Sequence, residues 1–351
     1  MKLGLKIFLI VISLILLAVV IGIAVIVPIS KRINDTSKPA KELSFWQSMI
    51  KDETPLKSVV MPGSHDAGTA GMAWVGETQS RDIGDQLRCG TRYFDLRVKM
   101  VKGELRIYHG PVNGLYFKDV LADVRDFMNE NPSETLVLDV HKFGNNEAKP
   151  KTVEMLDEYI GDRLLKNDTG KDELEFMEEL TLGEARGKCV LIWGDVDAYA
   201  LSDSRYFLRN DDHGDRNVGC LQSFYNKNWN WYYSSEKYIE KALPAYVNMY
   251  KESIGGLFVL QGQLTDGALI AGPRFREGCH EKNMNEYVES LAYDAETLKY
   301  INIIMRDFVS PQKNAITISL NFFKGAVKED SKDAFFNMVG ISEQTIACYG
   351  E

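Results

Sequence analysis

Short apolar runs alternate with longer stretches of helical periodicity along most of this chain. The runs are rich in Val, Ile, Leu and aromatic residues and are bounded by polar or glycine-containing segments, which is typical of strands buried on both faces. Helical stretches between such runs favour a parallel sheet over a sandwich. The runs predicted to be strands are Ser58–Met61, Tyr93–Val98, Leu105–Tyr108, Leu136–Val140, Cys189–Trp193, Leu257–Gln261, Asn302–Arg306 and Ala315–Leu320.

Three helices are predicted from apolar residues three or four positions apart. They are marked by Val120, Leu121, Val124, Phe127 and Met128 before the stop at Asn131-Pro132, by Val153, Leu156, Ile160 and Leu164, and by the range Tyr287–Ile301. Eight strands with intervening helices predict an α/β fold, a TIM-like barrel in which one large core is built from the whole domain.

The amino end carries a different pattern. Ile7–Ile29 contains no charged residue and is interrupted only by Ser13, Gly22 and Pro28. At about 1.5 Å per residue it is long enough to cross a hydrocarbon core of about 30 Å, and it is longer than the apolar part of a usual cleaved signal peptide. We expect an uncleaved membrane anchor in residues 1–30, a polar juxtamembrane linker in 31–42 and a catalytic domain in 43–351.

The side of the membrane is left open by the sequence. Lysines and arginines flank the apolar stretch on both sides, with a weak excess that favours a cytosolic domain. Two glycosylation sequons, Asn34-Asp35-Thr36 and Asn167-Asp168-Thr169, would be relevant only on the opposite side.

Charge and cysteine content exclude two classes of function. The formal net charge is −9 and no block of Lys or Arg is long enough for phosphate-backbone contacts, which excludes nucleic acid as a partner. The five cysteines show no CxxC or Cys/His spacing, which argues against a zinc site. The oligomeric state is not indicated by any pattern.

Five reactive side chains fall where the apolar runs end. His65, Asp66, Asp95, Arg97 and His109 supply two imidazoles, two carboxylates and a permanent cation within a short stretch of chain. Catalytic side chains of barrels lie at the carboxyl ends of parallel strands, so this arrangement predicts an active site. Two histidines and an arginine provide the base, the acid and the cation that phosphoryl transfer requires.

Each of these residues also has a simpler interpretation. Alternation along Tyr93–Val98 places Asp95 and Arg97 on one face, where an isolated Asp-x-Arg is most often a structural ion pair. A histidine between glycines, as His65 is, is most often a turn residue. The combination of both with His109 at another run's end favours the catalytic interpretation.

At these positions the chain resembles the X domain of phosphatidylinositol-specific phospholipases C. The resemblance is strongest over about Pro55–Phe143 and extends more weakly to about Phe323. It is carried by Met61-Pro62-Gly63-Ser64-His65-Asp66-Ala67, Thr91-Arg92-Tyr93-Phe94-Asp95-Leu96-Arg97 and Tyr108-His109-Gly110, with further landmarks in Asn131-Pro132-Ser133-Glu134-Thr135 and Ala185-Arg186-Gly187-Lys188.

The resemblance implies a distorted TIM barrel and a role for each site residue. It implies that His65 is the general base on the inositol 2-hydroxyl and that His109 is the general acid for the diacylglycerol oxygen, supported by Asp66. Arg97 would hold the phosphate oxygens, and Asp95 would orient the side of the site that carries Arg97 and His65. The chain also has Asp307 where the family has a carboxylate that fixes the tautomer of the base.

The substrate end departs from the family pattern. Lys142 or His141 stands where relatives have a calcium-binding glutamate or an inositol-binding lysine, and Ser223 stands where bacterial relatives have a carboxylate. Tyr225 is expected to stack beneath a sugar ring. The nearby aromatic residues are expected either to form a rim for lipid or to belong to the core; they are Trp229, Trp231, Tyr232 and Tyr233.

The sequence therefore predicts a membrane-anchored phosphodiesterase that acts on an inositol phospholipid, with no metal and with Arg97 in place of calcium. Two alternatives stay open. One is a phosphodiesterase for another lipid head group, which in barrel enzymes typically relies on metal-binding carboxylates. The other is a non-catalytic lipid-binding protein, which the intact pair of His65 and His109 argues against.

Overall fold

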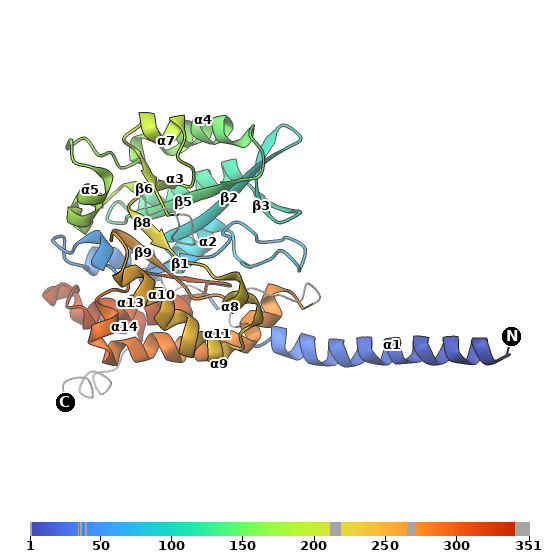
Figure 1. Ribbon diagram of the computed structural model, residues 1–351. Coiled ribbons are helices and arrows are strands. Elements are labelled where there is room, and N and C mark those ends of the chain that lie inside the picture. The colour runs from blue at the N-terminus through green and yellow to red at the C-terminus, as the bar shows by residue number, and fades with distance from the viewer. Residues whose placement is uncertain are drawn as a thin grey trace.

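In the computed structural model the chain forms an eight-stranded parallel barrel surrounded by helices, with one long helix projecting from it (Figure 1). The structure describes residues 2–33, 35, 37–38, 41–210, 219–264 and 271–340. The barrel strands are β1 (Met61–Ser64), β2 (Tyr93–Val101), β5 (Leu136–Phe143), β6 (Cys189–Trp193), β7 (Tyr206–Leu208), β8 (Leu221–Ser223), β9 (Leu257–Gln261) and β10 (Ile303–Arg306).

Neighbouring barrel strands follow the order of the chain. Parallel pairing runs from β1 through β2, β5, β6 and β7, and from β8 through β9 and β10 back to β1. The barrel closes between β7 and β8 through a parallel bridge of Arg209 with Leu221 and a hydrogen bond of 2.9 Å from Cys220 N to Leu208 O. The predicted TIM-like fold is confirmed.

The helices occupy the outside of the barrel (Figure 1). They are α1 (Lys2–Ser30), α2 (Ile83–Arg88), α3 (Phe117–Glu130), α4 (Ala148–Ile160), α5 (Glu173–Glu179), α6 (Leu182–Ala185), α7 (Ala198–Ser202), α8 (Lys227–Tyr232), α9 (Ser235–Lys237), α10 (Leu243–Lys251), α11 (Gly272–Ser290), α12 (Ala295–Leu298), α13 (Pro311–Phe323) and α14 (Lys332–Val339). A 3₁₀ segment over Lys41–Met49 packs Trp46 into the core before the first strand.

Alternation along the strands divides the core into layers. On β2, Tyr93 belongs to the cluster inside the barrel, whereas Phe94, Leu96 and Val98 pack outward against the helices. Gly63 on β1 is required by the close packing inside the barrel, because a Cβ there would lie 3.0 Å from side-chain atoms of Ile303 and Tyr93. This alternation aims Asp95 and Arg97 inward, as the sequence predicted.

Several predicted elements are wrong in detail. The strand predicted at Ser58–Met61 forms three residues later as β1, because Leu56–Ser58 is a 3₁₀ turn. The run Ala315–Leu320 is helical and lies in α13. This helix is capped by Ser310, whose side chain accepts a hydrogen bond from Lys313 N. The helix predicted over Tyr287–Ile301 is broken, since α11 ends at Ser290 and α12 starts at Ala295.

The run Leu105–Tyr108 is a strand, but not a barrel strand. It lies in β3 (Glu104–His109), which pairs antiparallel with β2 and with β4 (Val112–Tyr116). Lys102 and Gly103 join β2 to β3 with φ angles of 51° and 84°, and a two-residue turn of this kind reverses the chain. The short strands β7 and β8, which the sequence did not reveal, complete the barrel instead.

Helix α1 is long and apolar enough to cross a membrane over Lys6–Ser30. Its carboxyl end packs against α11, where a Cβ at Gly278 would overlap the carbonyl of Ile29. The predicted linker is docked in part on the domain, because Ile33 and Asp35 are buried. Asn34 and Thr36 of the first sequon lie outside the described residues.

Candidate active site

A polar cavity of about 190 Å³ opens at the carboxyl ends of the barrel strands. It contains nine of the ten residues predicted from sequence; Asp307 lies directly behind its wall, in contact with His65. The lining residues are His65, Asp66, Tyr93, Asp95, Arg97, His109, His141, Lys142, Arg209, Ser223, Tyr225, Trp231, Gln261 and Met305.

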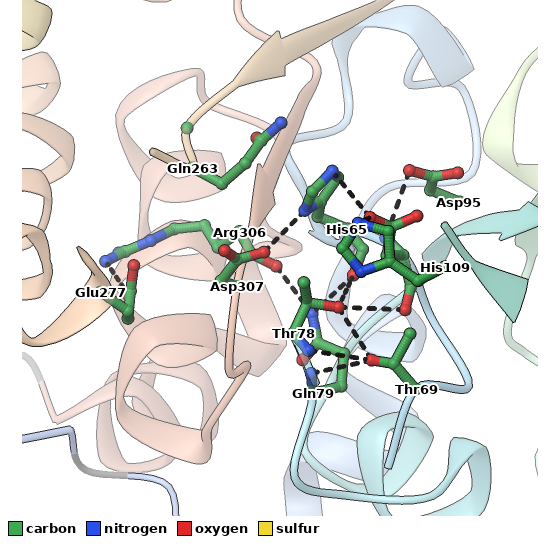
Figure 2. A network of polar contacts seen from close by, with 12 residues as sticks. His65, Thr69, Thr78, Gln79, Asp95, His109, Gln263, Glu277, Arg306 and Asp307 are labelled. Atoms are coloured by element: carbon green, nitrogen blue, oxygen red, sulfur yellow. Dashed lines mark hydrogen bonds and ion pairs between the residues drawn. The ribbon is translucent and has the colours of Figure 1, made fainter. Parts of the chain in front are cut away.

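His65 follows β1 directly and is held on its inner side by Asp307. Nδ1 of His65 lies 2.7 Å from Oδ1 of Asp307, so Nδ1 carries the hydrogen and Nε2 faces the cavity (Figure 2). Burial disfavours the charged imidazole, but the charges of Asp66 and Asp307 outweigh it and raise the pKa of His65 above its usual value. The side chain is therefore a stronger base than an exposed histidine.

A clamp formed by Thr78 and Gln79 fixes the backbone on which His65 is mounted. Gln79 donates from Nε2 to His65 O at 2.9 Å and to Arg306 O at 3.0 Å, and its Oε1 accepts from Val309 N. Thr78 donates from its hydroxyl to the same loop (Figure 2). The clamp joins the end of β1 to the end of β10, which carries Asp307. Sequence reasoning missed it because neither residue lies in a periodic run.

Asp66 lies at the centre of the charged groups. Its Oδ2 lies 3.3 Å from Nε2 of His65 and 3.4 Å from Nε2 of His109, and its Oδ1 lies 2.6 Å from Nε of Arg97. The residue has a φ of 43°, a region that Asp and Asn tolerate better than most residues. A single carboxylate thus faces both imidazoles.

Asp95 and Arg97 project side by side from β2 into the cavity. Nη2 of Arg97 lies 3.0 Å from Oδ2 of Asp95 and 3.5 Å from Nε2 of His65. Burial would raise the pKa of Asp95, but the charge and hydrogen bond of Arg97 hold the pKa of that carboxyl well below its usual range. Asp95 and Arg97 form an ion pair and both line the cavity, so a structural role for the pair does not exclude a role in the site.

His109 reaches the cavity from the end of β3, on the hairpin outside the barrel. The expectation that every reactive group ends a parallel strand is wrong for this residue. Its Nδ1 lies 2.9 Å from the carbonyl oxygen of Gly76, which fixes the hydrogen on Nδ1 and turns Nε2 toward Asp66. The two histidines therefore present Nε2 to the same carboxylate oxygen from different segments.

Three of these residues could also bind a cation. Ligand atoms of His65, Asp66 and Asp95 all lie within 4.8 Å of one another. Both carboxylates are already engaged by the guanidinium of Arg97, so a metal ion would have to compete with a permanent charge at the same place.

His141 and Lys142 have different surroundings although they are neighbours on β5. His141 is held between Asp95 and Asp139, with Nδ1 3.2 Å from Asp95 Oδ1. Its burial, reinforced by nearby Arg209, outweighs these carboxylates and keeps the pKa of His141 well below its usual value. His141 is therefore neutral, whereas the exposed Lys142 brings a charged amine to the rim of the cavity.

Arg209 is a cavity residue that the sequence did not reveal. It is only 4% exposed, and its Nη1 lies 3.1 Å from Oδ2 of Asp139, which also accepts a hydrogen bond of 2.7 Å from the Tyr93 hydroxyl. Arg209 follows β7, which has three residues and is too short to give a recognisable pattern.

The wall of the cavity opposite Lys142 and Arg209 carries the predicted residues Ser223 and Tyr225, which are polar but uncharged. Ser223 accepts a hydrogen bond of 2.7 Å from Gln261 Nε2, and Tyr225 accepts one of 3.1 Å from Trp231 Nε1. The predicted aromatic group is divided, since Trp231 lines the cavity, Tyr232 is 72% exposed and Trp229 packs with Tyr233 against the core.

A buried charge network lies behind Asp307. Lys313 donates to Asp307 O at 3.1 Å and to Glu277 Oε1 at 2.5 Å. Arg306 also lies near Glu277 (Figure 2). The remaining motif residues are structural. Glu134 forms a buried ion pair with Arg92 at 2.7 Å, and neither residue lines the cavity.

One family of known proteins matches this chain in sequence. Residues 53–193 match the family model described as phosphatidylinositol-specific phospholipase C, X domain. The 1-phosphatidylinositol phosphodiesterases of Listeria monocytogenes and Staphylococcus aureus (strain Newman) are 32% and 29% identical over 30% and 43% of this chain. These matches span 36% and 51% of the relatives' own lengths.

The fold extends this similarity over most of the chain. The solved phosphatidylinositol-specific phospholipase C of Listeria monocytogenes superposes with a TM-score of 0.61 at 21% identity, covering 80% of this chain and 98% of that one. The matched segment contains both histidines, Asp66, Asp95 and Arg97. Residues 53–193 of this chain are therefore similar to the X domain of phosphatidylinositol-specific phospholipases C.

Proposed function

We propose that this protein is a phosphodiesterase that cleaves phosphatidylinositol-type lipids and releases diacylglycerol and inositol cyclic phosphate. The observation that carries the proposal is the cavity itself, in which two imidazoles and one guanidinium surround Asp66. The names of the relatives support the lipid class, since they are 1-phosphatidylinositol phosphodiesterases.

The first step is an internal attack on phosphorus. Nε2 of His65 takes the proton of the inositol 2-hydroxyl, because Nδ1 is occupied by Asp307. The hydroxyl oxygen then attacks the neighbouring phosphorus as an intramolecular nucleophile, which gains a large effective concentration. A five-membered cyclic phosphodiester forms as the bond to the diacylglycerol oxygen breaks.

The other two groups act on the charge that this step creates. Arg97 holds the non-bridging oxygens, since a planar guanidinium matches phosphate oxygens and keeps its charge. His109 donates a proton from Nε2 to the departing diacylglycerol oxygen, and the charge of Asp66 stabilises its protonated form. Asp95 orients Arg97.

The polar end of the cavity accommodates the sugar ring in this proposal. Lys142 and Arg209 face hydroxyls from one side, while Ser223 and Gln261 face them from the other. Tyr225, fixed by the hydrogen bond from Trp231, offers its ring for stacking. Because Ser223 brings no carboxylate, the head group has to be tested among phosphatidylinositol and its analogues.

Residues 1–30 serve as a membrane anchor, 31–42 as a juxtamembrane segment and 43–351 as the catalytic domain. The juxtamembrane segment contacts Arg81 and Arg274. Arg81 lies in the chain after β1 and Arg274 in the chain after β9, so both are at the end of the barrel that carries the cavity. That placement supports a cavity that faces the membrane in which α1 is inserted.

The test is an assay of the purified full chain against a panel of phosphodiester lipids in mixed micelles. Phosphorus NMR at early times is expected to show the cyclic ester before the open monoester. His65→Ala and His109→Ala are each expected to lower turnover by at least about a hundredfold. Lys38→Gln serves as a control, since Lys38 is exposed and lies outside the cavity.

Each part of the proposal can fail separately. Folded histidine variants with near-wild-type turnover would refute the two-histidine mechanism. Immediate formation of the open monoester would indicate direct attack by water. Wild-type protein that binds the lipids without turnover would identify a non-catalytic lipid-binding protein.

A further inference from the structure

The segment after the apolar helix α1 is docked beside the catalytic clamp. Asp35 is 7% exposed, and its Oδ2 accepts a hydrogen bond of 2.6 Å from Nη2 of Arg274. Two residues further on, the carbonyl oxygen of Ser37 accepts a hydrogen bond from Nη2 of Arg81. Arg81 lies two residues after Gln79 of the clamp, so the juxtamembrane segment contacts the chain beside the clamp.

Arg274 connects Asp35 to the active site. Its guanidinium carbon lies 4.7 Å from the ring centroid of Phe308, the residue that follows Asp307. The backbone N–H of Phe308 donates to Thr78 O at 2.7 Å, which ties the same residue to the clamp. The path from Asp35 to the imidazole of His65 therefore runs through Arg274, Phe308 and Asp307.

Phe308 needs this support because of its backbone. Its φ is 46°, in the left-handed region, where a bulky aromatic residue is strained. Such a conformation persists only where surrounding contacts determine it. The guanidinium over the ring and the hydrogen bond to Thr78 are contacts of that kind.

The pair of Asp35 and Arg274 is charged at neutral pH. Burial raises the pKa of Asp35, but the hydrogen bond and charge of Arg274 outweigh it, so the pKa is lower than usual. Glu77 lies 3.9 Å from the same guanidinium and is the second carboxylate near it. Removing the carboxylate of Asp35 would leave Arg274 free to turn toward Glu77 and away from Phe308.

We propose that Asp35 is a positioning residue that holds Asp307 against His65 through Arg274 and Phe308, so that the juxtamembrane segment is part of the support of the active site. The inference rests on the proposed function, because it takes His65 as the catalytic base. It adds a contact between the anchor and the reaction, since Asp35 lies five residues after the end of α1.

The test compares full-length variants in mixed micelles of detergent and phosphatidylinositol. Asp35→Asn keeps the shape of the side chain and removes its charge. We expect kcat to fall about tenfold, which is less than the roughly hundredfold loss that a misplacement of about 1 Å can cause. We expect KM to be nearly unchanged, because Asp35 lies outside the cavity. Asp35→Glu is expected to recover most of kcat, and the neighbouring Lys38→Gln is expected to match the wild type.

A second measurement does not depend on turnover. Carbon-13 NMR of histidine-labelled full-length protein reports the pKa of His65, which a displaced Asp307 would support less. Asp35→Asn is expected to lower that pKa and to move the acidic limb of the pH profile in the same direction. The double variant with Arg274→Gln is expected to add little to the single one, because both act on one path.

An unchanged kcat and an unchanged His65 pKa in folded Asp35→Asn would overturn the inference and leave the proposed function standing. If Asp35→Asn does not fold, Arg274→Lys replaces it in the test, because this variant keeps the charge but loses the planar group over Phe308. It is expected to show the same lower kcat and lower pKa of His65, and the absence of both would overturn the inference. If the wild type turns over no lipid, the proposed function fails, while the pKa of His65 still decides whether Asp35 positions Asp307.

Discussion

Nε2 of His109 lies 3.4 Å from Oδ2 of Asp66, although the two residues reach the cavity on different segments. The same oxygen lies 3.3 Å from Nε2 of His65. One carboxylate can therefore favour the protonated form of whichever histidine holds the proton. In the proposed reaction one imidazole gains a proton while the other loses one, so the charge of Asp66 faces a protonated imidazole before and after the step.

Asp66→Asn tests this shared role. Asn tolerates the φ of 43° at this position, so the variant removes charge without forcing the backbone to move. We expect kcat to fall by about a hundredfold or more, the scale seen when one group is removed from a site that stabilises developing charge.

The measurement is turnover of phosphatidylinositol between about pH 5 and 9, with Asp123→Asn as a matched control. Asp123 is a partly buried carboxylate that caps Gly84 on the outside of the barrel. Wild-type kcat in folded Asp66→Asn would contradict a role for this charge.

The pH dependence of the base gives a second prediction. The charges of Asp66 and Asp307 raise the pKa of His65, and a general base must be neutral to act. The acidic limb of kcat/KM is therefore expected above about pH 6.5, the usual histidine value. Asp307→Asn removes one of the charges and is expected to shift the titration of His65 to lower pH, as followed by carbon-13 NMR.

The same shift has a consequence for stability. A raised folded-state pKa means that His65 stabilises the fold below about pH 6.5 and that this contribution is lost as pH rises through the raised value. Two results would show that the contact of 2.7 Å between His65 and Asp307 does not set the basicity of His65. One is an acidic limb of kcat/KM below pH 6. The other is a His65 titration that is unchanged in Asp307→Asn.

The predicted site residues meet in one cavity, whereas several predicted strands of the barrel are misplaced. His65, Asp66, Asp95 and Arg97 could be found because each lies at or near the end of an apolar run, and the alternation on β2 fixes the direction of its side chains. Arg209 could not, because the three residues of β7 give no pattern. Thr78 and Gln79 act through backbone carbonyls of distant segments, which no spacing in the sequence indicates.

The wrong strands have physical reasons as well. Ala315–Leu320 contains β-branched residues in an apolar run, which periodicity alone cannot distinguish from a buried strand. Ser310 and Pro311 favour a helix here, because Ser310 caps its first turn and proline suits its first position. His109 was expected at the end of a parallel strand, and the turn at Lys102-Gly103 makes that strand antiparallel.

The anchor gives a third prediction. The chain carries a net charge of −9, so an anionic bilayer repels it and α1 is expected to supply the attachment. Deletion of residues 1–30 is expected to leave a soluble enzyme that keeps Asp35 in place. Flotation with vesicles measures the attachment, and strong, salt-sensitive binding of the truncated form would reveal a cationic surface instead. The intact mass of the expressed full chain shows whether α1 is retained or cleaved.

The last prediction is that catalysis survives the removal of metal ions. Arg97 brings a permanent positive charge to both Asp66 and Asp95, the two carboxylates that a cation near His65 would need. A guanidinium can neutralise the phosphate as calcium would, and it repels a cation from the same place. Turnover is therefore expected to be unchanged in EGTA or EDTA.

Variants of Arg97 separate charge from geometry. Arg97→Ala is expected to lower kcat by about a hundredfold to a thousandfold, because the developing charge on the phosphate oxygens loses its partner. Arg97→Lys is expected to recover only part of this loss, since an ammonium cannot offer two parallel donors. Added calcium is expected to rescue neither variant at concentrations that leave the wild type unaffected. Loss of wild-type turnover on chelation, with recovery on adding calcium, would mean that the ion and not Arg97 carries the positive charge of this site.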